Sequence, residues 1–391
     1  MSLSVVIVSR ARPRLLARAL TALDQQRDAA FEVVVAADDL APLAPWERRV
    51  KALRFAEANV SAARNAAAGV AAGDVLAFLD DDAVPEPTWA AWLIEAFGDP
   101  DVSLAATMLL GPDGIRPQYG LRGVTPGGIE HPLDAPPGPV RGAGAVRTEG
   151  ASMGIRRAAL SELGGFDPAF RFYMDETELN LRAHAAGLTT AWVPGAVAHH
   201  GLAPSETRAP SRAPTSLREV GASVAVLSRR HGGDPEAMRT RLRTGQRARL
   251  ARHLNAGRIE PRDAVRLMAD LEAGWEAGRA RTLPELGPLP SPPPFLPFGP
   301  RVTGPPAFLH GRDRAALMAE ACARLDGGAP TSLLVLSRGA ARHVVRFEDG
   351  VWVQEGGRWG RSAPGIAPGL PPERRAAAER ERVADVRALG P

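Results

Sequence analysis

Residues 75–87 read VLAFLDDDAVPEP, an apolar run that ends in three adjacent aspartates, Asp80, Asp81 and Asp82. A short uninterrupted apolar run is typical of a strand buried on both faces of a parallel sheet. Three neighbouring carboxylates repel one another unless a cation offsets their charge. The stretch therefore predicts a buried strand whose carboxyl end carries acids suited to a hard divalent cation such as Mn²⁺ or Mg²⁺.

Strand-like and helix-like segments alternate before this stretch. Strands are expected at residues 4–9, 31–39 and 75–80, and helices at 12–26 and 59–74. This order predicts an α/β fold with a doubly wound, mainly parallel sheet. Ligands of such folds bind beyond the carboxyl ends of the strands, where Asp38, Asp39 and the three aspartates lie.

The rest of the chain is expected to complete this domain and extend it. Helices are expected at 88–97, 151–167 and 175–187, strands at 102–110, 189–194 and 196–200, a Gly- and Pro-rich loop at 111–148, and a hairpin at 343–354. The expected division is an α/β domain at 1–213, a helical extension at 214–282, a Pro-rich linker or wrapping arm at 283–300, and a small α+β unit of unassigned role at 301–391. The Pro-rich stretch predicts that the last unit is separable from the first.

Composition places the chain among globular proteins. It has 391 residues, of which 45% are hydrophobic and 24% charged, as in a soluble domain with a sizeable core. The single cysteine, Cys322, excludes an intramolecular disulfide and fits a reducing compartment. The first residues lack the order of a signal peptide, and no apolar run has the length of a membrane span. These features predict a cytoplasmic protein, either free or peripheral at the inner face of a membrane.

Charge is distributed unevenly along the chain. Residues 1–200 carry a net charge of about −6 and residues 201–391 about +10, with arginine supplying nearly all the basic groups. The basic half fits a solvated helix surface, or contact with phosphate-bearing partners or an anionic membrane. No nucleic-acid partner is expected.

Seven segments, in their order and spacing, resemble the family 2 glycosyltransferases, enzymes of the GT-A fold. They are SVVIVSRARPRLLARAL, FEVVVAADD, NVSAARNAAAGVAAGD, FLDDD, GASMGIRRAALSELGGFDPAF, DETELNLRAHAAG and WVPGAVAHH, within about residues 3–205. The resemblance implies a GT-A catalytic domain at 1–213. It further implies metal-dependent transfer of a sugar from a nucleotide-diphosphate donor to a glycan, lipid-linked or protein acceptor, with inversion by a single displacement.

The resemblance also implies a metal site. Asp80 would face the ribose or nucleotide, Asp82 would bind the metal, and Asp81 between them would assist or be solvated. The segment at 192–200 would supply a further ligand from His199 or His200, which face opposite sides of a strand, and its spacing favours His200. Removing Asp82 is expected to relieve repulsion among the acids and to cost little stability.

Donor-binding roles follow from the same resemblance. Arg64 would point towards the donor, and Ser9 lies at the end of the first strand. Asp38, with Asp39 beside it, would lie near the nucleobase. Ala37 stands where the family has a second acid, so the identity of the base and of the sugar stays open.

The acids at 175–178 are candidates for the catalytic base. Transfer to a hydroxyl requires a carboxylate that accepts its proton, and the matching family position is Glu176, with Asp175 as the alternative. Glu178 is expected to pair with Arg182, four residues later on the same helix. Two other functions compete: a nucleotidyltransferase, which shares the fold type and acidic metal ligands, and a non-catalytic nucleotide- or glycan-binding module.

Overall fold

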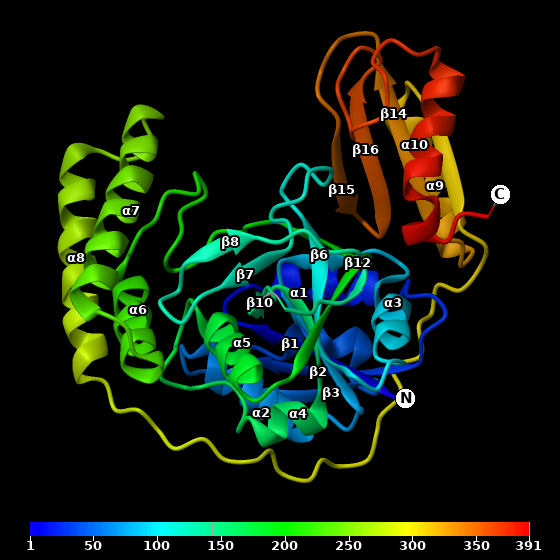
Figure 1. The fold of residues 1–391 in the computed structure, drawn as a ribbon. Helices are drawn as coiled ribbons and strands as arrows, with labels where there is room; N and C mark the ends of the chain where they lie inside the picture. The colour runs from blue at the N-terminus through cyan, green and yellow to red at the C-terminus, as the bar shows by residue number, and fades with distance from the viewer. Residues whose placement is uncertain (143, 391) are drawn as a thin grey trace.

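A mixed sheet forms the centre of the computed structural model, which describes residues 1–142 and 144–390 (Figure 1). Its strands are β1 (Leu3–Ser9), β2 (Phe31–Ala37), β3 (Val50–Arg54), β4 (Val75–Asp80), β5 (Ala83–Pro85), β6 (Val102–Leu110), β9 (Gly138–Pro139), β11 (Ser152–Arg156) and β12 (Thr189–His200). The order is β3-β2-β1-β4-β11-β6-β12-β5, with β9 on β12. Strands β3, β2, β1 and β4 are parallel, whereas β11 runs antiparallel between β4 and β6. The expected mixed, mainly parallel α/β fold is confirmed.

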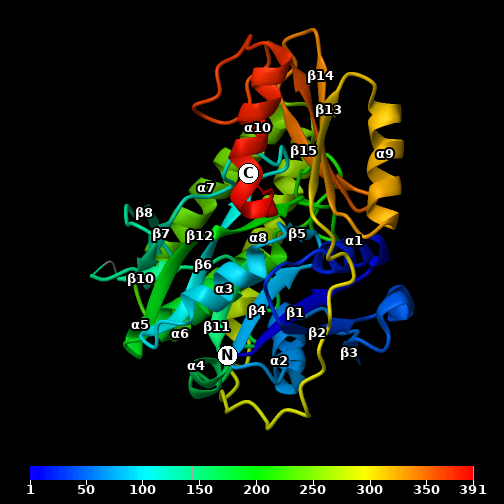
Figure 2. The same cartoon turned by 90° about the vertical axis from the view of Figure 1, so that its right-hand side faces the viewer.

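Helices cover both faces of this sheet (Figure 2). They are α1 (Pro13–Leu23), the 3₁₀ helix η1 (Ala41–Trp46), α2 (Val60–Val70), α3 (Trp89–Ala96), α4 (Arg157–Glu162) and α5 (Asp175–Ala185). Successive side chains of a strand point to opposite faces. Val5 and Ile7 of β1 therefore pack with α1 and α3, and Val6 packs with α2, α4 and α5. This double burial explains why the strands read as continuous apolar runs.

Two expected elements differ in the structure. Residues 151–167 were expected to be helical, but their first part is strand β11 and only the short α4 follows. The two strands expected at 189–194 and 196–200 are one strand, β12, with an irregularity between Val193 and Val197. In both places pairing with neighbouring strands overrides the local propensity, which favours a helix in the first and a break at Pro194 in the second.

The loop expected at 111–148 contains further strands. These are β7 (Arg122–Val124), β8 (Glu130–Pro132) and β10 (Ala145–Arg147), which form a three-stranded sheet. Strands this short in a Gly- and Pro-rich segment give no alternating pattern to read. Strand β3 was not predicted from the sequence for a different reason. It lies at the edge of the sheet, where its residues are only partly buried, so they form no continuous apolar run.

The segment at 214–282 is helical, as expected. It consists of α6 (Arg218–His231), α7 (Pro235–Asn255) and α8 (Pro261–Ala280), here called the helical lobe. Glycines let α6 and α8 approach closely: a Cβ on Gly274 would lie 1.9 Å from the Arg218 carbonyl oxygen. Among the helices of the described residues, none combines the length and apolarity needed to cross a bilayer.

Residues 283–300 pass from the helical lobe beneath the N-terminal domain as an extended strap (Figure 1). The Leu289 amide donates to Ser161 Oγ at 3.1 Å, and the Leu296 amide donates to Glu32 at 2.9 Å. Phe298 stacks on Phe31 with ring centroids 5.5 Å apart. Of the two expectations for this Pro-rich stretch, the contacts favour the wrapping arm.

Residues 301–390 form an α+β unit at one end of the molecule. Its elements are β13 (Ala307–Gly311), α9 (Arg314–Asp326), β14 (Thr331–Ser337), β15 (Val344–Glu348), β16 (Val351–Gly357) and α10 (Pro372–Arg387). The sheet order is β13-β14-β16-β15. The expected hairpin is present, and its turn residues Asp349 and Gly350 adopt φ values of 49° and 80°, as a two-residue turn of this kind requires.

The C-terminal unit shares a core and a buried ion pair with the N-terminal domain. Val84 and Ile115 cluster with Val345 and Trp352. Both nitrogens of the Arg387 fork donate to the Glu86 carboxylate, at 2.9 and 3.0 Å. Because these groups are buried from both sides, we expect a chain truncated near residue 282 to expose apolar surface and a Glu86 that has lost Arg387 and keeps only His199 as a partner.

This docking is expected to depend on pH through Glu86. Burial acts to raise the pKa of Glu86, but the charge of Arg387 and the His199 hydrogen bond outweigh it and lower the pKa from 4.5 to about 2. The stabilisation is therefore complete above pH 4.5 and is lost as pH falls towards 2. It corresponds to about 3 kcal/mol. Unfolding free energies of wild type and Glu86→Gln should converge over that interval, and a gap independent of pH would contradict the prediction.

Candidate active site

A cleft of about 720 Å³ opens between the N-terminal domain and the helical lobe. Asp80, at the carboxyl end of β4, and His200, at the end of β12, line its floor. Asp175 and Glu176 from the start of α5 line it as well, as does Arg64 of α2. The structure thus brings five of the residues selected from the sequence into one cavity.

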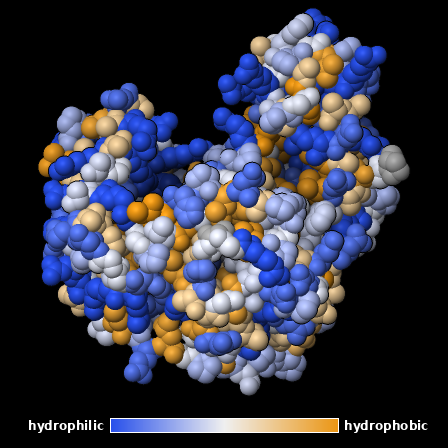
Figure 3. Space-filling view, in the orientation of Figure 1, coloured by the Kyte–Doolittle hydropathy of each residue, from blue (hydrophilic) through white to orange (hydrophobic). Residues whose placement is uncertain are grey.

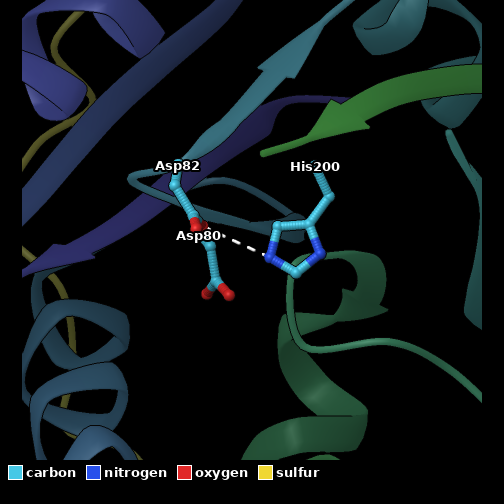
Figure 4. A group of neighbouring side chains, drawn as sticks. All are labelled: Asp80, Asp82 and His200. Carbon is cyan, nitrogen blue, oxygen red and sulfur yellow. Dashed lines mark ion pairs between the residues drawn. The ribbon is translucent and has the colours of Figure 1, made fainter. Parts of the chain in front are cut away.

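Asp80, Asp82 and His200 form a compact group of potential metal ligands (Figure 4). One ligand atom from each residue lies within 4.8 Å of the other two. His200 Nε2 is 3.3 Å from Asp82 Oδ1. Two carboxylates and an imidazole suit Mn²⁺, and the oxygen pair also suits Mg²⁺. The donor set therefore fits a divalent cation.

Neighbouring groups orient these side chains. His200 Nδ1 lies 2.9 Å from Gln118 Oε1, an acceptor that favours a proton on Nδ1, so Nε2 is the ring nitrogen that faces Asp82. The Ala203 amide donates to Asp82 Oδ2 at 2.7 Å. Burial acts to raise the pKa of Asp82, but the hydrogen bond and charge of His200 dominate and lower it. Asp82 is therefore ionised at neutral pH.

Asp81 faces away from this group. It accepts hydrogen bonds from Ser9 Oγ at 2.7 Å and from Arg12 at 2.8 Å. Burial raises the pKa of Asp81 to about 6, against the lowering effect of Arg12. Asp81 is buried rather than solvated, and Ser9 is engaged with it. Both residues hold the turn after β4 to the end of β1.

Arg64 connects the metal group to the start of α5. It donates to Asp80 Oδ1 at 3.0 Å, to the Gly150 carbonyl oxygen at 2.9 Å, and to Asp175. The Arg64 side chain is only 4% exposed. Asn59 starts α2 by capping the Ala62 amide, which fixes the helix that carries Arg64.

Asp175 and Glu176 open α5 directly after a strained turn. Tyr173 and Met174 adopt left-handed conformations with φ of 76° and 66°, which non-glycine residues rarely do. This turn directs both carboxylates into the cleft. Glu176 accepts from Arg147 at 3.0 Å, whereas Asp175 is held by Arg64.

The two acids differ in protonation. Burial raises the pKa of Asp175 to about 7, despite the charge of Arg64. Burial also acts on Glu176, but the Arg147 charge outweighs it and lowers the pKa of Glu176. Glu176 is therefore the more completely ionised of the two near neutral pH. Glu178 points elsewhere and pairs with Arg182 at 2.6 Å, as expected.

Besides Ser9, Asp81 and Asp82, three more of the residues selected from the sequence are not part of the cleft lining. Asp38 accepts the Ala11 amide at 3.1 Å, and Asp39 is exposed beside it; their contact with a nucleobase stays a prediction. His199 bonds Glu86 at 2.8 Å and packs on Trp352. The structure thus separates the two histidines and places only His200 with the acids.

Several residues of the site carry no recognisable sequence signal. Gln118 and Arg147 come from the Gly- and Pro-rich region around the small sheet. Arg249 and Arg252 line the cleft from α7, far from the other site residues in sequence. Gly150, two residues before β11, was not singled out in the sequence either, although its carbonyl oxygen accepts a hydrogen bond from Arg64.

Gly150→Ala is expected to weaken donor binding without unfolding the protein. A Cβ at this position would lie 2.8 and 2.9 Å from the two terminal nitrogens of Arg64, which three partners hold in place. Returning the displaced Arg64 to its place when the donor binds would cost about 1–3 kcal/mol, the range for an overpacked buried site, which is about 5- to 150-fold in affinity. Calorimetry with nucleotide sugars measures the loss. Gly287→Ala is the control, because no atom lies within 4 Å of its added Cβ; equal affinity in both variants would contradict the prediction.

Comparison with known proteins gives a family match and several solved structures. Residues 4–164 match the sequence model described as "Glycosyl transferase family 2". GalNAc-T7 with UDP, GalNAc and Mn²⁺ is 20% identical, with 58% of this chain and 48% of that chain covered and a TM-score of 0.45. S. aureus TarS is 15% identical, with 61% and 41% covered and a TM-score of 0.43.

A third structure covers more of its own chain. Mannosyltransferase PcManGT from Pyrobaculum calidifontis, in complex with GDP-Man and Mn²⁺, is 15% identical, with 71% of this chain and 86% of that chain covered and a TM-score of 0.44. The present chain spans less than half the length of the first two structures. No curated protein matches the chain.

Proposed function

Residues 4–164 are a family 2 glycosyltransferase domain, and from this premise we propose that the protein transfers a sugar from a nucleoside-diphosphate donor to an acceptor hydroxyl. The observation that carries the proposal is the group of Asp80, Asp82 and His200, of which Asp80 and His200 line a cleft that is also lined by Arg64 and Glu176. Such a transfer requires three features in one place: ligands for a metal cation, an arginine near the diphosphate, and an ionised carboxylate that can act as the base.

Asp80, Asp82 and His200 would hold the divalent cation. When bound there, the cation would supply positive charge that stabilises the leaving diphosphate. Gln118 keeps the His200 imidazole in the required tautomer, and the Ala203 amide keeps the Asp82 carboxylate oriented. We propose Mn²⁺ in preference to Mg²⁺ because the set includes an imidazole nitrogen.

Glu176 would act as the general base. The acceptor oxygen forms a bond to the anomeric carbon of the sugar while the bond from that carbon to the diphosphate oxygen breaks. The hydroxyl proton moves to the Glu176 carboxylate, and the bonding electron pair leaves with the diphosphate. A single displacement of this kind inverts the anomeric carbon. Arg147 orients Glu176 by donating to one of its carboxylate oxygens at 3.0 Å.

The test is product release from nucleotide sugars. The full chain is incubated with UDP-, GDP- and dTDP-sugars and with Mn²⁺, Mg²⁺ or a chelator, and the products are identified by mass spectrometry. We expect metal-dependent release of a nucleoside diphosphate. Release of pyrophosphate would instead indicate a nucleotidyltransferase, and binding without any turnover would indicate a non-catalytic module.

The charge distribution bears on where the protein is located in the cell. A cytoplasmic location, with contact between the arginine-rich half and an anionic membrane, is supported by the net charge of residues 201–391, about +10. Such contact would weaken with salt, because exposed charges are screened over about 8 Å at physiological ionic strength. Sedimentation with anionic vesicles at increasing salt tests it, and binding that does not respond to salt would contradict it.

A further inference from the structure

The outer part of the cleft is lined by arginines. They are Arg208, Arg212, Arg249, Arg252 and Arg258, from the segment after β12, from α7 and from the turn after it. Figure 3 shows the molecule hollowed between the helical lobe and the C-terminal unit, above the N-terminal domain. Within residues 1–142 and 144–390, no carboxylate forms an ion pair with any of these five arginines.

The arginines nearer the start of α7 differ from these, because they form ion pairs. Arg239 and Arg243 lie about three and about two turns before Arg249, and both pair with Glu272 of α8, at 2.7 and 2.9 Å. Arg249 and Arg252, on the part of the helix that lines the cleft, have no such partner among the residues described. Burial lowers the pKa of Arg249, and the neighbouring charge of Arg252 acts in the same direction. Unpaired like charges in a partly closed site create a positive potential that an anion would relieve.

Arg208 lies on the donor side of the cleft, whereas Arg249 and Arg252 lie on the wall that α7 forms. Arg208 Nε donates to the Ala203 carbonyl oxygen at 3.0 Å, and the Ala203 amide bonds the metal-site residue Asp82. Arg208 is therefore placed for the donor diphosphate. Arg249 and Arg252 belong to α7 and have no such link to Asp82. A donor diphosphate held at the aspartates would therefore not neutralise the positive charge of these two arginines.

Aromatic rings lie next to the α7 arginines. The chain contains only two tyrosines, and both Tyr119 and Tyr173 line this cleft together with Phe172. Each of the three residues is 40–43% exposed, and Arg122 covers one face of the Tyr119 ring, 4.1 Å from its centroid. Exposed aromatic side chains that gather in one place are typical of a binding surface. Exposed aromatic faces with a polar tip match the apolar faces and hydroxyls of a sugar ring.

We propose that the acceptor is a saccharide carrying an anionic group, a phosphate or a carboxylate, which Arg249 and Arg252 bind while Tyr119 and Tyr173 pack on its sugar. The inference rests on the proposed transferase function and adds the acceptor class. A guanidinium group binds either anion through paired N–H donors. Tyr173 lies in the turn directly before α5, close in the chain to Glu176, which would take the proton from the acceptor hydroxyl.

The test compares three disaccharides of one linkage: glucosyl-glucose, glucuronosyl-glucose and 6-phosphoglucosyl-glucose. Their affinity for the full chain is measured by calorimetry in the presence of Mn²⁺ and nucleoside diphosphate. We expect one or both charged probes to bind about 10- to 100-fold more tightly than the neutral one, the range of a charge-assisted hydrogen bond. The better of the two charged probes identifies the anion.

Matched variants assign the preference to the α7 arginines. Arg249→Gln combined with Arg252→Gln should abolish the preference for charge, whereas Arg239→Gln combined with Arg243→Gln, on the same helix, should retain it. Indifference to charge in wild type, whether all probes bind equally or none binds, overturns the inference. Loss of nucleoside diphosphate affinity in the first variant also overturns it, because the arginines would then serve the donor. Failure of the transferase proposal is seen separately, as absence of nucleoside diphosphate release from any donor.

Discussion

Asp82→Asn is expected to remove metal-dependent donor binding and to lower sugar transfer by on the order of 10³-fold. The carboxylate is one of three potential ligands that approach within 4.8 Å of one another, and the charge stabilisation that a catalytic cation supplies amounts to several kcal/mol. Calorimetric titration of Mn²⁺ and of donor, with turnover beside it, measures the effect. Asp101→Asn is the control, since Asp101 is an exposed acid paired with Arg141.

The choice of asparagine follows from the structure. The sequence suggested that losing one of three adjacent acids would relieve repulsion. In the fold, Asp82 is buried, accepts the Ala203 amide and lies beside His200, so Asp82→Ala would leave a buried donor without an acceptor. Asparagine keeps an oxygen for that amide. Turnover of Asp82→Asn that equals wild type at saturating Mn²⁺ would refute the ligand role.

Glu176→Gln is expected to keep donor and metal affinity but to lower transfer by about 10²–10⁴-fold, the usual contribution of a general base. Glutamine keeps the shape of the side chain and a hydrogen-bond acceptor for Arg147, and it cannot take up the proton. The measurement is turnover with acceptor, with donor affinity determined beside it. Asp175→Asn is the comparison, since Asp175 is held by Arg64 on the other side of the same turn.

The pH profile separates the two acids. With Asp175 as the base, transfer would fall as pH drops through about 7, where burial places the pKa of that carboxyl. With Glu176 as the base, transfer would not fall near pH 7. Arg147 lowers the pKa of Glu176, so its carboxylate stays ionised down to a pH below the usual pKa of glutamate. Near-normal turnover in Glu176→Gln, together with loss in Asp175→Asn, would move the base to Asp175. Retention of anomeric configuration in the product would exclude a single displacement.

Local patterns were sufficient wherever the deciding interaction is itself local. The apolar run at 75–80 predicts strand β4 because burial on both faces leaves no polar position. The placement of Asp80 and Asp82 at its end follows from the directionality of parallel strands. The Glu178–Arg182 pair follows from helical spacing, and the hairpin turn at 349–350 follows from residues that tolerate positive φ.

Tertiary structure decided everything that depends on segments far apart in the chain. Spacing in the sequence only favours His200 over His199, and the packing of Trp352 and Glu86 against one side of β12 is what leaves His200 facing the acids. The docking of the C-terminal unit through Arg387 and Glu86, 301 residues apart, leaves no periodic signal in either segment. The arginines of α7 likewise read as a solvated surface until the fold places one part of that helix against Glu272 and the other over the cleft. A sequence pattern records which face of an element is buried, but not which distant element covers it, and that contact sets the charge, tautomer and access of each group in the site.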